Sequence, residues 1–118
     1  MFYNIVSCRQ SQESSIIVAG GYGESSLSSV EILDPDTYHW RQGPDLPFGI
    51  DSAQMVEDQD GGVVLVGGDF VSNHWLDTLY RLPHGGADAE WTKMEQKLKV
   101  GRRLHTAFLV PDNVVDCS

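Results

Sequence analysis

The sequence is poor in cysteine and in positive charge, and it contains no long apolar run. Its two cysteines, Cys8 and Cys117, lie near opposite ends without a CxxC spacing, so neither a disulfide framework nor a cysteine metal site is indicated. Lysine and arginine total 8 against 17 acidic residues, a net charge of -9, and this charge repels polyphosphate backbones. Nucleic acid is therefore not an expected partner.

The apolar runs are also far shorter than the roughly 18 residues of a membrane span, and the start of the chain lacks a secretory-signal pattern. We therefore expect a cytoplasmic protein without membrane contact. A sustained 3.6-residue period is missing as well, which argues against helices. The sequence shows instead a repeat. Two glycine pairs, Gly20-Gly21 and Gly67-Gly68, are 67 minus 20, or 47, positions apart, and each is followed by a tryptophan, Trp40 or Trp91.

Each repeated unit divides into four short segments separated by turn signals. The second segment of each unit is apolar throughout, as expected for a strand covered on both faces. The third alternates, through Val30 and Ile32 in one unit and Thr78, Tyr80 and Leu82 in the other, which indicates one buried face. The eight expected strands are residues 3–8, 15–19, 29–33, 38–42, 52–57, 62–66, 77–82 and 90–94. Alignment of residues 47–58 with 101–112 places Ala53 on Ala107 and predicts the start of a third unit.

The two units resemble kelch repeats. The resemblance rests on the segments "IIVAGG", "VEILDP" and "VLVGGD" and on the tryptophan that follows each pair of glycines. The resemblance implies an all-β fold, a kelch-type β-propeller fragment with two four-stranded antiparallel blades plus one extra strand. Kelch repeat 1 then covers residues 1–50, kelch repeat 2 covers 51–103, and 104–118 hold the first strand of a third repeat and a C-terminal tail. The motif residues with structural roles are Gly20, Gly21, Trp40, Gly67, Gly68 and Trp91. Each tryptophan is expected to pack on its own blade.

Two blades do not close a propeller, which needs roughly four to eight. The chain is therefore expected to be a fragment of a longer kelch protein, and further kelch blades are needed to close the ring; assembly of several chains is the alternative. Because the outer blade faces lack a neighbour, the chain alone is predicted to self-associate, to bind the dye ANS or to melt without a sharp transition.

Kelch proteins commonly bind a partner protein or peptide through the loops at one end of the propeller. By this resemblance, the recognition loops are residues 22–28, 45–49, 69–75 and 97–103. The candidate partner-binding side chains in them are Tyr22, Ser25, Asn73, His74, Arg102 and Arg103. Five of the eight basic residues lie between positions 93 and 103. This segment is either a solvated loop or a site for an acidic peptide.

The resemblance implies a protein–protein interaction module, such as the substrate-recognition part of a cullin-type ubiquitin ligase or an actin-binding protein. The alternative is a propeller enzyme resembling galactose oxidase or a sugar isomerase. Its metal site would need clustered histidines, but His39, His74, His84 and His105 have no ligand spacing. We expect a protein that is not an enzyme, with no catalytic residue, no metal and no cofactor.

Overall fold

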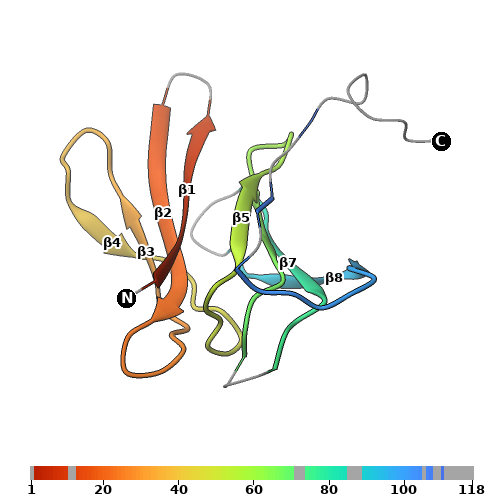
Figure 1. The fold of residues 1–118 in the computed structure, drawn as a ribbon. Coiled ribbons are helices and arrows are strands. Elements are labelled where there is room, and N and C mark those ends of the chain that lie inside the picture. Colours follow the sequence, from red (N-terminus) through yellow and green to blue (C-terminus); the bar gives the residue numbers. More distant parts are fainter. Residues whose placement is uncertain are drawn as a thin grey trace.

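Two four-stranded antiparallel sheets stand side by side, as Figure 1 shows. This computed structural model describes residues 2–10, 13–70, 74–84, 89–104, 106, 107 and 110, with side chains from residue 15 onward. The first sheet holds β1 (Phe2–Gln10), β2 (Glu13–Tyr22), β3 (Val30–Leu33) and β4 (Trp40–Gln42). The second holds β5 (Gln54–Glu57), β6 (Val63–Val66), β7 (Thr78–Leu82) and β8 (Thr92–Lys97).

Each strand pairs with the next strand in the chain, so both sheets are simple meanders. The fold is all-β, as predicted, and none of the residues given above forms a helix that could cross a membrane. The predicted extra strand falls mainly outside the described residues. Of its segment, Leu104, Thr106, Ala107 and Val110 are described, and none of these four is in a strand.

The glycine pairs have the same backbone conformation in the two units. The φ angles are 67° and 105° at Gly20 and Gly21, and 64° and 103° at Gly67 and Gly68. Positive φ is strained for residues with a Cβ atom, which explains glycine at these positions. At Gly68 space is restricted too, because a Cβ atom would lie 2.8 Å from the side chains of Ala53 and Ile50.

A set of five backbone hydrogen bonds around each glycine pair is repeated, with lengths of 2.7 to 3.1 Å. Gly21 N–H donates to Ile50 O in the first unit, and Gly68 N–H donates to Arg102 O in the second. Arg102 thus corresponds to Ile50, an offset of 102 minus 50, or 52 residues. The sequence alignment had an offset of 54 at this point, so the structure corrects it by two residues. A matching pair of positive φ angles, 56° at Ser52 and 54° at Leu104, supports the correction.

Strand register divides the side chains of each sheet between two faces. We define the front face as the one that carries the tryptophan, and the back face as the opposite one. In the first sheet, Ile16 pairs with Leu33 and Leu33 with Trp40, so these lie on the front face. The back face carries Ile17 and Ile32, which pair with each other, and also Ala19 and Val30.

In the second sheet, the front face carries two register pairs, Val63 with Leu82 and Leu65 with Tyr80. Trp91 lies on the same face, since its neighbour Thr92 pairs with Arg81, next to Leu82. The back face carries Val64 with Arg81 and Val66 with Leu79.

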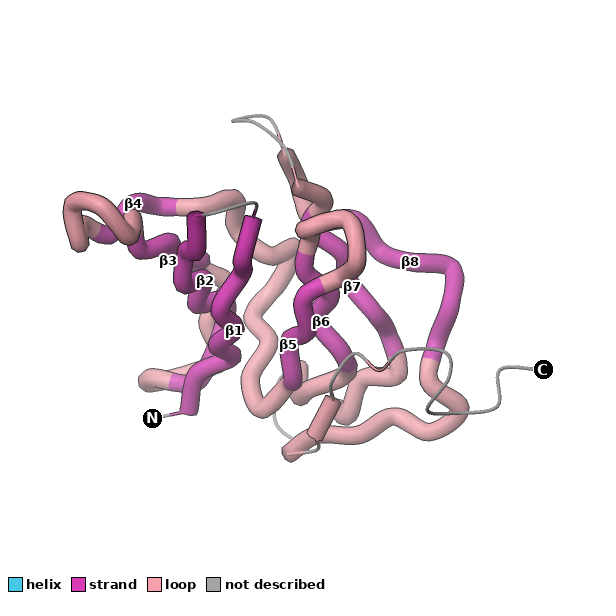
Figure 2. Tube along the Cα trace, turned by 90° about the horizontal axis from the view of Figure 1, so that it is seen from above, coloured by secondary structure: helices cyan, strands magenta, loops and turns pink. Residues whose placement is uncertain are grey.

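The hydrophobic core lies between the back face of the first sheet and the front face of the second. Ile17, Ala19 and Val30 are buried in the first sheet. The buried residues of the second sheet are Met55, Val63, Leu65, Tyr80, Leu82 and Trp91. Figure 2 shows that β1 and β5 are the strands that adjoin between the sheets. The two units therefore pack through unlike faces.

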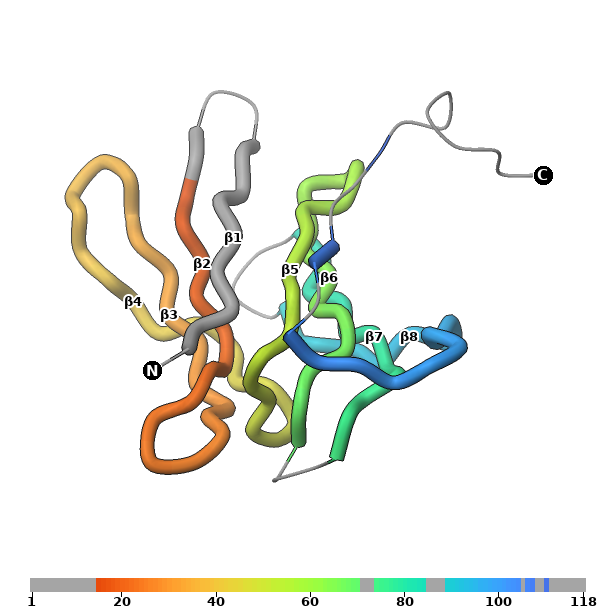
Figure 3. Tube along the Cα trace, in the orientation of Figure 1, coloured from red at the N-terminus to blue at the C-terminus, as the bar shows by residue number. Residues whose placement is uncertain are grey.

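The linker between the sheets, residues 43–53, completes this interface, and Figure 3 follows it from β4 to β5. Leu46 and Ile50 are buried in the core. Phe48 lies 4.5 Å from Phe70 and 5.7 Å from Tyr80, measured between ring centroids. The indole Nε1 of Trp91 donates to Pro44 O at 2.9 Å. Trp91 therefore also contacts the linker that precedes its own sheet. The sequence predicted only that each tryptophan packs on its own blade.

Candidate functional site

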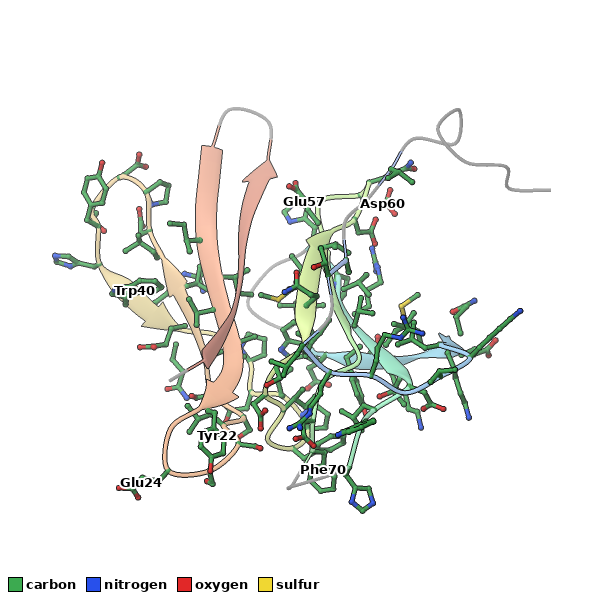
Figure 4. All side chains as sticks on the ribbon, viewed as in Figure 1. Tyr22, Glu24, Trp40, Glu57, Asp60 and Phe70 are labelled. Atoms are coloured by element: carbon green, nitrogen blue, oxygen red, sulfur yellow. The ribbon has the colours of Figure 1, made fainter. Side chains whose placement is uncertain are left out.

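The loops that follow β2 and β6 lie at the same end of the two sheets. Figure 4 shows Tyr22, Glu24 and Phe70 at this end, while Glu57 and Asp60 lie at the other. We call this end the loop face: it comprises the described residues of 22–28, 45–50, 69–76 and 97–103. The equivalent placement follows from the repeated hydrogen bonds, because the carbonyls of Gly21 and Gly68 accept from Leu27 and Leu76 in the same way.

An exposed aromatic side chain and a guanidinium group adjoin on the loop face. Trp75 is 57% exposed, and the guanidinium carbon of Arg103 lies 5.6 Å from the centre of its ring. Arg103 Nη1 donates to the Oδ2 of Asp69 at 3.0 Å. Asp69 is buried, so the carboxylate fixes the guanidinium group from below while the outer side of Arg103 stays in solvent.

The same carboxylate also holds the loop after β6. The backbone N–H of His74 donates to Asp69 Oδ1 at 3.1 Å, and Phe70 N–H donates to His74 O at 2.9 Å. The rings of Phe70 and His74 lie edge to face, 6.2 Å apart. We name Asp69, Phe70, His74, Trp75 and Arg103 the Trp75 cluster. Its exposed side chains are positioned by a buried anion, which reduces the entropy lost on binding.

A second buried carboxylate connects the two recognition loops. Asp51 pairs with Asp69 through two backbone hydrogen bonds, of 2.7 and 3.0 Å. The carboxylate of Asp51 accepts from Ser26 Oγ at 2.5 Å and from Ser52 Oγ at 2.8 Å. Since Ser26 is in the loop after β2, this chain of bonds fixes that loop relative to the Trp75 cluster.

The structure brings some of the sequence-predicted residues together and separates others. His74 and Arg103 both bind Asp69 and belong to the Trp75 cluster. Arg102 is exposed beside them, and its Nε donates to Val100 O at 3.3 Å. Tyr22 and Ser25 are exposed on the loop after β2, and within the described residues no hydrogen bond, ion pair or ring contact joins them to the cluster. Asn73 lies outside the described residues. Binding by any of these six remains a prediction.

Sequence reasoning missed Trp75 and Asp69, the residues around which the cluster is built. A signal for Trp75 was present: the chain has three tryptophans, and only Trp40 and Trp91 fit the repeat. The burial of Asp69 had no such signal, since an aspartate after a glycine pair is also typical of a solvated turn.

The histidines are not brought together within the described part of the chain. His39, His74 and His84 are exposed, and His105 lies outside the described residues. Among those described, no group of three or more His, Cys, Asp or Glu side chains could hold a metal ion.

One ion pair lies at the end opposite the loop face, in the β5–β6 turn. Asp58 Oδ2 accepts from Arg81 Nε at 2.6 Å, and its Oδ1 accepts from the backbone N–H of Asp60 at 2.9 Å. The Asp60 N–H and then the Arg81 side chain hold the pKa of Asp58 below its ordinary value. This pair stabilises the hairpin and is not part of the loop face.

Comparison with known families agrees with this architecture. The family model of the kelch motif matches residues 11–47, a segment that includes all of β2, β3 and β4. Residues 11–47 therefore form a kelch motif, as the sequence motifs predict, and the two all-β sheets are consistent with a kelch propeller fragment. No curated protein matches the chain. Kelch repeats serve protein–protein interaction in general, and the matched segment supports a repeat module of that type.

Proposed function

We propose that the loop face binds a segment of a partner protein, with Trp75 and Arg103 as its principal contacts. The exposed Trp75, positioned by the Arg103–Asp69 ion pair, carries this proposal. Tryptophan and arginine are the residue types most often found to dominate protein interfaces, because they combine a large apolar area with directional hydrogen bonds. The two side chains are already in place before a partner arrives.

The charges of the loop face favour a partner with acidic side chains. Lys99 and Arg102 are exposed next to Arg103, in a segment that carries most of the positive charge of the chain. Arg103 is compensated by Asp69, whereas among the described residues no ion pair involves Lys99 or Arg102. An apolar side chain of the partner packs on Trp75, and a carboxylate binds Arg102.

Binding of this kind suits the substrate-recognition part of a cullin-type ubiquitin ligase, or an actin-binding scaffold, in the cytoplasm. Both roles come from the kelch resemblance. The chain acts in either case by binding and catalyses no reaction. Co-sedimentation with filamentous actin separates the two roles: sedimentation of the chain with filaments, lost in Trp75→Ala, favours the scaffold, and a chain that stays in the supernatant favours the adaptor.

The test begins with peptides selected from a random library on the full chain. Their affinity is then measured by fluorescence anisotropy for the wild type, Trp75→Ala and Arg103→Ala. Each substitution is expected to weaken binding by about tenfold or more, equivalent to ~1.4 kcal/mol. Tyr38→Ala and Lys93→Ala are the matched controls, an exposed aromatic and an exposed cation outside the loop face. Peptides bound equally well by all four variants contradict the proposal.

A further inference from the structure

Equivalent segments follow the two sheets, residues 45–51 (DLPFGID) and 97–103 (KLKVGRR). In each segment the leucine N–H donates to a backbone carbonyl of the loop after β2 or β6, at 2.8 Å from Leu46 and at 2.7 Å from Leu98. In each, a Cβ atom on the glycine would collide with a backbone oxygen of the same loop. The two segments are therefore placed in the same way relative to their own sheets.

The charge of the segment reverses between the two units. Asp45 in the first segment corresponds to Lys97 in the second, and Asp51 corresponds to Arg103. The second segment contains two further basic residues and no acidic one. The backbone hydrogen bonds that place the segments are the same in both units, so they require neither charge. We therefore relate the reversal to what the loop face binds.

The reversal gives the loop face an acidic half and a basic half. The acidic half comprises the described residues of 22–28 and 45–50, and the basic half comprises those of 69–76 and 97–103. The acidic half carries exposed Glu24 and Asp45 and contains no lysine or arginine. The basic half carries four lysine and arginine residues, and its one acidic residue, Asp69, is buried. Figure 4 shows Glu24 and Phe70, one from each half.

The exposed charges of the acidic half are not neutralised by the chain itself. No ion pair among the described residues involves Glu24 or Asp45. Like charges that face each other across an interface weaken binding, and opposite charges fix the register of the partner. A partner segment with acidic side chains along its whole length would therefore be repelled by the acidic half.

We propose that the partner segment is dipolar, with basic side chains on the acidic half and acidic side chains on the basic half. The inference rests on the proposed function and adds the acidic half to the contacts made by Trp75 and Arg102. Val100, the counterpart of Phe48, is 61% exposed and joins Trp75 as an exposed apolar side chain of the basic half. We therefore expect the apolar residue of the partner close to its acidic end.

The experiment compares three peptide libraries selected on the full chain. All have the same randomised apolar centre. It is flanked by lysines on one side and glutamates on the other, by glutamates on both sides, or by lysines on both sides. The dipolar library is expected to yield peptides that bind about tenfold or more tightly than those of the other two, as measured by fluorescence anisotropy. The net charge of -9 alone would favour the all-lysine library.

Charge reversal in the acidic half then tests the assignment of the basic end. Asp45→Lys is expected to weaken the best dipolar peptide by about tenfold, and replacement of the lysines of the peptide by glutamates is expected to restore its binding. Asp36→Lys is the matched control, because Asp36 is exposed in the turn between β3 and β4, outside the loop face. It is expected to change the affinity by less than about twofold, since salt screens distant charges.

The outcomes separate this inference from the proposed function. The dipolar partner is wrong if all-glutamate or all-lysine peptides bind as tightly as dipolar ones, or if Asp45→Lys and Asp36→Lys have equal effects. Loss of binding in Trp75→Ala would in those cases still support the loop face. Both proposals are wrong if no library yields a peptide whose binding depends on Trp75. Circular dichroism checks the fold, and Glu24→Lys repeats the test if Asp45→Lys does not fold.

Discussion

Trp40 and Trp91 have corresponding places in two sheets of the same design, yet one is exposed and the other is buried. Each follows its glycine pair at a similar distance. Trp40 pairs with Leu33, and Trp91 directly precedes Thr92, which pairs with Arg81 next to Leu82. The difference arises from the linker 43–53, which covers Trp91 and accepts its hydrogen bond. The repeat thus determines the geometry of a unit, and the neighbour determines which of its faces is buried.

The largest expected effect separates the two tryptophans. Trp91→Ala is expected to lower the free energy of unfolding by about 3–5 kcal/mol, because it removes a buried aromatic side chain and leaves a cavity. Trp40→Ala is expected to cost only about 1 kcal/mol, since half of that side chain is already in water. Urea denaturation at low protein concentration measures both values. Equal losses would show that both tryptophans act within their own sheets alone.

The next largest expected effect concerns the backbone conformation at the glycine pairs. Gly68→Ala is expected to cost about 3 kcal/mol, because the position has positive φ and a Cβ atom there would meet Ala53 and Ile50 at 2.8 Å. Gly23→Ala is the control, since its nearest neighbours are Leu27 side-chain atoms at 3.8 and 3.9 Å, and a change of about 0.5 kcal/mol is expected. Thermal and urea unfolding compare the two. If Gly68→Ala lowers the free energy of unfolding as little as Gly23→Ala does, the end of the strand can shift to make room for the Cβ atom.

The two linkers give an intermediate effect. Phe48→Ala is expected to cost about 2 kcal/mol, because its ring packs on Phe70 and Tyr80. Val100→Ala, at the corresponding place after the second sheet, is expected to cost about 0.5 kcal/mol in the monomer. The same urea denaturation measures both. A Val100→Ala loss as large as that of Phe48→Ala would contradict the assignment of an uncovered second linker.

The smallest effect concerns pH. The pKa of Asp58 is lowered in the folded chain by the Asp60 N–H and by Arg81, so ionised Asp58 stabilises the fold above its unfolded pKa of about 3.9. The contribution is lost as the pH falls through the lower folded pKa. Asp58→Asn is expected to lower the free energy of unfolding by only about 0.5 kcal/mol at pH 7, since solvent screens the pair. At a pH low enough to protonate the wild-type carboxyl, the substitution is expected to have no effect. Urea unfolding of the wild type and of Asp58→Asn at several pH values measures this effect. A difference in unfolding free energy that does not change with pH would contradict the expectation.

Much of the architecture could be predicted from local sequence patterns. The glycine pairs, the alternation at Val30 and Ile32, and the turn at Asp34 are local signals, and the structure places a strand end, a strand and a turn there. The backbone N–H groups of Asp36 and Thr37 donate to the carboxylate of Asp34 and close that turn, a geometry typical of aspartate in turns.

The burial of particular faces could not be predicted in the same way. The alternation of Val30 and of Tyr80 indicates one buried face in each third strand, but Val30 lies on a back face and Tyr80 on a front face. Both faces of β2 and β6 are apolar, so the pattern contains no information on which face has a neighbour. The Arg103–Asp69 pair joins residues 34 positions apart, and a contact of that separation depends on the tertiary fold.

The five repeated hydrogen bonds around the glycine pairs use only backbone groups, and this separates architecture from recognition in evolution. Any amino acid except proline supplies the same N–H and C=O groups, so Tyr22 or Trp75 can be exchanged without moving the sheets that carry them. A gene that duplicates such a unit inherits the geometry at once. New binding preferences then need only substitutions in the loops, while selection on the glycine pairs preserves the frame.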